Sequence, residues 1–122
     1  GIKKAGWDQT QVYTVETKGA ASFAKSYELG KCVTLDRIET IATSLGARKV
    51  AERAFELAFT LPVTPLTVTD EEAVEAAQAI ASMHRILVEP ACGAAVSPVY
   101  HSKVDLSKYK KVIIILCGGV VI

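Results

Sequence analysis

Five consecutive apolar residues, 112–116, constrain the fold more strongly than any other feature of the sequence. A strand with one wet face alternates polar and apolar residues, whereas a strand that is apolar at every position is expected in a parallel sheet buried on both faces. Such a sheet needs helices on either side of it. The run therefore favours an α/β fold, and it leads directly into Cys117, Gly118 and Gly119.

The remaining sequence alternates short β-prone runs with helical patterns, which is the element order of a parallel α/β sheet. We predict strands at residues 12–15, 66–68 and 86–88. We predict helices at residues 20–29, from Thr34 or Asp36 to Leu45, at 50–59, from Thr69 to about His84, and from Pro90 to about Tyr100.

Residue types at the helix ends support these boundaries. Gly30 and Gly46 stand where a left-handed residue commonly ends a helix. Thr69 and Glu72 have the spacing of a capping box, and Pro90 suits a first helical turn. We expect residues 1–122 to form a single α/β segment, a parallel sheet with flanking helices, and we expect the natural protein to continue on both sides.

Composition excludes several classes of partner. The net charge is +1 and no long block of like charge occurs, so no nucleic-acid partner is expected. No apolar run approaches the roughly 20 residues that cross a bilayer, so no membrane partner is expected. The three cysteines, Cys32, Cys92 and Cys117, form no C-x-x-C pair, which argues against a disulfide framework or a zinc site and for a reducing, cytoplasmic location.

Ligands of open α/β sheets bind outside the carboxyl ends of the strands. This rule selects three places, residues 16–20, 89–94 and 117–119. Each also has a purely structural interpretation: a solvated loop or helix cap, a helix start with a small packing face, and a tight turn with a buried cysteine. His84 and His101 stand near predicted helix ends, where a cation interacts well with the helix dipole.

In combination, four stretches resemble the pyridoxal-phosphate-dependent L-serine/L-threonine dehydratases, which have the tryptophan-synthase-β-like fold (fold type II). The matching stretches are VYTVETKGAASF, LDRIETIATSLGA, ILVEPACGAAVSPVY and VIIILCGG. They leave residues 63–79 and the loop 102–110 poorly matched. The VEPACGAA element with a downstream CGG is the most specific part of the resemblance.

The resemblance implies that Cys117 faces the pyridine nitrogen of the cofactor, while Gly118 and Gly119 let the strand end lie against the ring. A neutral thiol at this position would leave the ring a weaker electron sink than a carboxylate would. β-Elimination tolerates this, because the leaving hydroxyl departs soon after the α-proton. The family usually has serine or asparagine after the CGG, where this chain has Val120.

The resemblance also implies a monovalent cation, typically potassium, beside the cofactor phosphate loop. Its ligands fall on the carboxylate of Glu16 and on the backbone carbonyls of Ala20, Leu45 and Ala47. Oxygen ligands of this kind suit hard cations.

The implied reaction is deamination of L-serine or L-threonine to a 2-oxo acid and ammonia. The family uses a lysine in a Ser-x-Lys setting and a glycine-rich phosphate loop, and this chain has neither. The resemblance therefore implies that the remainder of the catalytic domain supplies both, and that the 122-residue chain is inactive alone. A homodimer is also consistent with the family.

Two other functions remain open from the sequence. The chain could be a non-catalytic relative that serves as a packing or interaction module. It could also belong to a related elimination or synthase enzyme acting on cysteine or homoserine derivatives, although the cysteine at position 117 favours the dehydratase branch.

Overall fold

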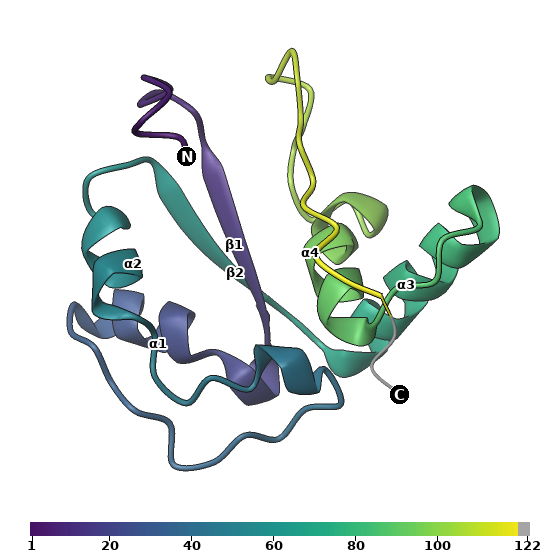
Figure 1. Ribbon diagram of the computed structural model, residues 1–122, viewed down its shortest axis with the longest axis horizontal. Helices are drawn as coiled ribbons and strands as arrows, with labels where there is room; N and C mark the ends of the chain where they lie inside the picture. Colours follow the sequence, from purple (N-terminus) through teal and green to yellow (C-terminus); the bar gives the residue numbers. More distant parts are fainter. Residues whose placement is uncertain (120–122) are drawn as a thin grey trace.

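The computed structural model describes residues 1–119 and has the predicted α/β architecture (Figure 1). Its two strands pair in parallel, with Val12 opposite Val63 and Thr17 opposite Val68. In chain order the elements are β1 (Val12–Thr17), the 3-10 turn η1 (Lys18–Ala20), α1 (Ser22–Leu29), the 3-10 turn η2 (Thr43–Leu45), α2 (Glu52–Leu57), β2 (Val63–Val68), α3 (Asp70–His84) and α4 (Pro90–Tyr100).

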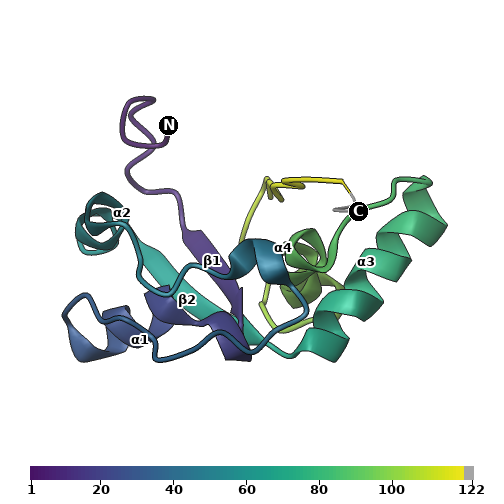
Figure 2. The same ribbon diagram turned by 60° about the horizontal axis from the view of Figure 1, so that its bottom comes forward.

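The strand pair lies between two groups of helices. Helices α1 and α2 lie on one side of the strands and α3 and α4 on the other (Figures 1 and 2). Helix α4 contacts both strands, and α3 packs against α4 as an outer layer. The core between them is built on Val68, Ala73 and Ala94, with the partly buried Val15 and Leu45 packed against it.

The helix ends follow the local signals of the sequence. The Thr69 side chain accepts a hydrogen bond from the Glu72 amide (3.1 Å), and the Glu72 carboxylate accepts one from the Thr69 amide (2.8 Å), so the predicted capping box is confirmed. Gly30 ends α1 in the left-handed region, with φ of 64°. Pro90 opens α4 as predicted. Among residues 1–119, no helix is long and apolar enough to cross a bilayer.

The helix predicted from Thr34 or Asp36 to Leu45 is wrong, because only the short turn η2 forms there. Its backbone amides bond to distant residues instead. The amide of Glu39 donates to the carbonyl of Gly19 (2.9 Å), and that of Ile41 donates to the carboxylate of Asp70 (2.9 Å). Several residues of this segment are β-branched and weak helix formers, so these long-range bonds decide its conformation.

The predicted strands are only partly confirmed. Strand β2 is longer than predicted and includes Pro65, which an edge strand tolerates. Residues 86–88 and 112–116 form no strand, and Ile113 and Ile115 are 75% and 68% exposed. The prediction that residues 112–116 are buried on both faces is therefore wrong for this chain. The physical reason is the lack of a partner, since the sheet formed by residues 1–119 consists of β1 and β2.

Candidate functional site

Glu16 stands at the carboxyl end of β1 and is held by the start of α1. Its two carboxylate oxygens accept hydrogen bonds from the backbone amides of Phe23 and Ala24, each at 2.9 Å. These amides belong to the first turn of α1, where free N–H groups and the helix dipole favour a negative charge. Glu16 therefore caps the start of α1, as one of the two structural interpretations of this segment expects. Each oxygen still has a further lone pair for a second partner.

A loop of residues 38–47 crosses over the carboxyl ends of both strands. The Thr17 hydroxyl at the end of β1 donates to the Thr40 hydroxyl (2.9 Å), which donates to Asp70 just beyond β2 (2.5 Å). The loop runs so close to Gly19 that a Cβ there would lie 1.7 Å from the Glu39 carbonyl oxygen. A side chain at position 19 would therefore displace the loop.

The expected cation ligands lie on η1, on this loop and at the end of β1. Ala20 is fully buried, while the Leu45 side chain packs with Val15 against the core. The Leu45 carbonyl already accepts the Ala47 amide (2.8 Å) and, like Glu16, retains a lone pair. The donor set of carboxylate and carbonyl oxygens fits a hard cation. Within the described residues, no group of three or more His, Cys, Asp or Glu side chains offers an alternative metal site.

The segment Cys117–Gly119 meets the start of α4. The tight turn with a buried cysteine considered from the sequence does not form, because these residues adopt no turn and Cys117 is exposed. A Cβ on Gly118 would lie 3.3 Å from the Glu89 Oε1 atom, whereas a Cβ on Gly119 would meet no atom of residues 1–119 within 4 Å. The other carboxylate oxygen of Glu89 accepts a hydrogen bond from the Ser44 hydroxyl at 2.7 Å. The structure thus brings together two of the three places selected from the sequence, residues 89–94 and 117–119, and adds η2 to them.

Cys117 is exposed, and the pKa of its thiol is raised above the ordinary value. Partial desolvation raises its pKa, and the neighbouring Cys92 and the charge of Glu89 raise it further. Cys92 is fully buried in the first turn of α4. A thiol with a raised pKa, beside a glycine whose Cβ would meet no atom of the described residues within 4 Å, fits the edge of a flat aromatic ring, because an uncharged thiol would not repel an unprotonated ring nitrogen.

The contributions of Ser44 and Cys92 were not predicted from the sequence. In the sequence, Glu89 stood out only as the start of a motif, and Ser44 lies 45 residues away from it along the chain. Cys92 was part of the same motif, and its neighbourhood with Cys117 depends on how the C-terminal segment folds back on α4.

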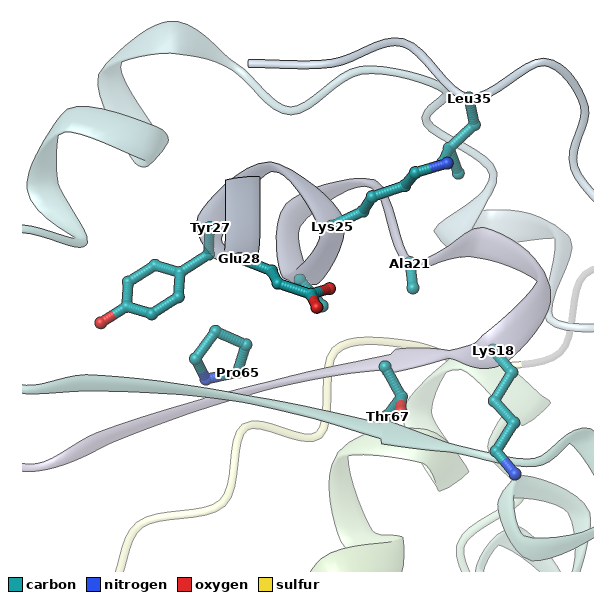
Figure 3. Close-up of a pocket in the computed structure, with 9 residues that line it drawn as sticks. Lys18, Ala21, Lys25, Tyr27, Glu28, Leu35, Pro65 and Thr67 are labelled. Atoms are coloured by element: carbon teal, nitrogen blue, oxygen red, sulfur yellow. The ribbon is translucent and has the colours of Figure 1, made fainter. Parts of the chain in front are cut away.

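A surface groove lies elsewhere, between α1 and β2. It has a volume of about 740 Å³ and is lined by Lys18, Lys25, Tyr27, Glu28, Pro65 and Thr67, among others. In Figure 3 the Lys25 side chain extends toward Leu35, whereas the Lys18 side chain points away from Leu35. Lys18 belongs to the selected segment 16–20, but none of the residues expected to bind the cofactor or the cation lines this groove. The candidate functional site is therefore the Cys117–Gly119 segment, which lies close to Glu89 at the start of α4, while Glu89 is hydrogen-bonded to Ser44 of η2.

Known proteins similar to this chain are pyridoxal-phosphate enzymes. Residues 1–118 match the family model described as pyridoxal-phosphate dependent enzyme. A serine dehydratase-like protein of Mus musculus is 39% identical over 98% of this chain, and an L-serine dehydratase/L-threonine deaminase of Bos taurus is 37% identical over the same share. The chain spans 39% of the length of each of these relatives.

Solved structures give the same family. A fungal L-serine ammonia-lyase from Rhizomucor miehei aligns with a TM-score of 0.82 and 36% identity, over 84% of this chain and 33% of its own. Maize serine racemase aligns with a TM-score of 0.84 and 25% identity, over 96% of this chain and 38% of its own. The departure noted at position 120 lies outside the described residues. On these matches, the chain belongs to the family of pyridoxal-phosphate-dependent enzymes and has the architecture of its fold type II members.

Proposed function

We propose that the chain forms part of an L-serine/L-threonine ammonia-lyase that converts the amino acid to a 2-oxo acid and ammonia by β-elimination. The observation that carries the proposal is the Cys117–Gly119 segment beside the start of α4, where the pKa of the Cys117 thiol is raised and no atom of the described residues approaches a Cβ on Gly119 within 4 Å. The relatives named as serine dehydratase or threonine deaminase, at 34–39% identity, support the choice of reaction.

The bound cofactor would supply the electron sink for loss of the α-proton and the β-hydroxyl. The part of this chain is to hold the edge of the ring. Cys117 would face the ring nitrogen without a charge, and Gly118 and Gly119 would allow the backbone to approach the ring. The reactive lysine and the phosphate loop would come from the remainder of the catalytic domain, so we expect no activity from the 122 residues alone.

Racemisation of serine is the second candidate reaction, and the structural similarity to maize serine racemase favours it. Both reactions begin with removal of the α-proton, so the fold alone does not separate them. The sequence does favour elimination, because the identity is 36% to the fungal L-serine ammonia-lyase and 25% to the racemase.

Four further assignments belong to this proposal. Potassium would bind between Glu16 and the carbonyls of Ala20, Leu45 and Ala47, a set whose donor chemistry suits it. The exposed residues 112–116 would pair with the remainder of the catalytic domain, and the parent protein could form a homodimer. The compartment would be the cytoplasm, in keeping with three cysteines that form no disulfide.

The test is turnover by the full-length protein that contains this chain, reconstituted with pyridoxal phosphate. L-Serine and L-threonine should each yield a 2-oxo acid and ammonia in equal amounts. A protein that binds the cofactor and transforms neither amino acid would refute the lyase proposal. A protein that binds no cofactor would favour the non-catalytic interaction module.

A further inference from the structure

Glu89 is the N-cap residue of α4, yet its side chain makes no capping hydrogen bond to its own helix. It is directed instead at two segments that are distant in sequence. One carboxylate oxygen accepts from the Ser44 hydroxyl at 2.7 Å, and the other lies 3.3 Å from the position that a Gly118 Cβ would take. A single half-buried carboxylate therefore lies between η2 and the C-terminal segment.

The two segments that Glu89 joins are those to which the two expected ligands were assigned. Ser44 directly precedes Leu45, whose carbonyl belongs to the expected cation set. Gly118 directly follows Cys117, the residue expected at the cofactor ring. One side chain is thus hydrogen-bonded to the cation loop and lies close to the expected cofactor segment at Gly118.

Simpler roles do not account for this placement. Among residues 1–119, no lysine, arginine or histidine forms an ion pair with Glu89. Ser44 is exposed, so its hydrogen bond to Glu89 adds little to folding stability. The value of the contact lies in fixing the position of one segment relative to the other.

We propose that Glu89 is a positioning residue that transmits occupancy of the cation site at the Ser44–Ala47 loop to the cofactor-facing segment Cys117–Gly119. This inference rests on the proposed function, which assigns the cation and the cofactor. A cation bound to the Leu45 and Ala47 carbonyls would fix the loop, and the loop would fix Glu89 through Ser44. The carboxylate would in turn set the position of Gly118 and the surroundings of the Cys117 thiol.

The experiment uses the full-length protein with bound pyridoxal phosphate, in potassium chloride and in choline chloride at equal ionic strength. Two quantities are measured: the rate of Cys117 alkylation by iodoacetamide, followed by peptide mass spectrometry, and the fluorescence of the cofactor. Ser44→Ala removes only the link to the loop. Glu89→Ala removes the whole connection. Thr43→Ala in the same turn and the exposed Glu71→Gln on α3 serve as matched controls.

In the unmodified protein and both controls, potassium should change the alkylation rate about fivefold or more, the lower end of ordinary allosteric coupling. In Ser44→Ala and Glu89→Ala the ratio should fall close to one while the cofactor stays bound. Should Glu89→Ala fail to fold, Ser44→Ala decides alone, because Ser44 is exposed.

A full potassium response in Ser44→Ala would overturn the proposal. An unmodified protein without any potassium response would overturn it too. Neither result depends on formation of a 2-oxo acid in the turnover assay, so failure of this coupling is distinguishable from failure of the proposed reaction.

Discussion

Gly93 lies against the backbone of Ala73, so that a Cβ on Gly93 would be 2.0 Å from the Ala73 carbonyl oxygen. It would also lie 3.0 Å from the Cβ of Ala77. Helices α3 and α4 are therefore in backbone contact at this point. The small residues at the start of α4 thus have a packing role, as their pattern in the sequence predicts.

Replacing this glycine tests the contact. Gly93→Ala should lower the free energy of unfolding by about 3 kcal/mol, because the methyl group meets backbone that cannot rotate away. Urea denaturation followed by circular dichroism measures the change. Ala95→Gly, on the same helix, is the control for a general effect of helix propensity, expected to cost about 1 kcal/mol. A stability of Gly93→Ala equal to that of the unmodified protein would refute the contact.

Gly119→Ala should leave the stability unchanged and weaken cofactor binding, in contrast to Gly93→Ala. No atom of the described part of the chain lies within 4 Å of the added methyl group, so the free energy of unfolding should not change. The methyl group would, however, occupy space that the proposal gives to the cofactor ring. We expect the Kd for pyridoxal phosphate to rise about tenfold, equivalent to roughly 1.4 kcal/mol. Fluorescence titration of the full-length protein measures it, and an unchanged Kd would argue against this placement of the ring.

Glu16→Ala should destabilise the protein by about 2 kcal/mol, because two amides at the start of α1 lose a charged acceptor. Glu16→Gln should lose less, since its amide oxygen can still accept one of the bonds. The matched control is Glu28→Ala, an exposed carboxylate on the same helix. Thermal unfolding compares the three variants. If Glu28→Ala were as destabilising as Glu16→Ala, the capping role of Glu16 would be wrong.

Glu72 should make stability depend on pH in the acid range. The Lys103 ammonium, 2.6 Å away, lowers the pKa of Glu72 below its ordinary value of 4.5, and the Thr69 amide lowers it further. The resulting stabilisation is fully present above the ordinary pKa. It is lost as the pH falls through the lowered pKa, where the folded state must also take up the proton.

The corresponding variant is Glu72→Gln, which should cost about 1 kcal/mol at neutral pH. Urea denaturation at a series of acid pH values should show its difference from the unmodified protein shrinking toward zero. A difference that stays constant down to the lowest pH would mean that the charge of Glu72 contributes nothing.

The parts of the fold that depend on local chemistry could be predicted from the sequence. The capping box of Thr69 and Glu72, the opening Pro90 and the terminal Gly30 each act within a few residues of their own position. The helix predicted in the segment before Leu45 was wrong because long-range contacts, and not local chemistry, decide the conformation of that segment. Its amides bond to Gly19 and Asp70, and no local pattern announces partners at that distance.

The same distinction holds for the candidate site. The rule that ligands bind at the ends of strands selected the segments of Glu89 and Cys117, and these segments do meet. Ser44 could not be selected, because its importance comes only from the Glu89 side chain that it contacts. Residues 112–116 are all apolar, but their apolarity does not show where a partner strand would lie.

The most direct test of the central claim is the fate of L-serine in a single reaction with the full-length protein. Chiral chromatography and a 2-oxo acid assay on the same sample give the ratio of pyruvate to D-serine. A serine ammonia-lyase should convert the substrate almost entirely to pyruvate and ammonia. Accumulation of D-serine without an equal or greater amount of pyruvate would contradict the account and identify a racemase.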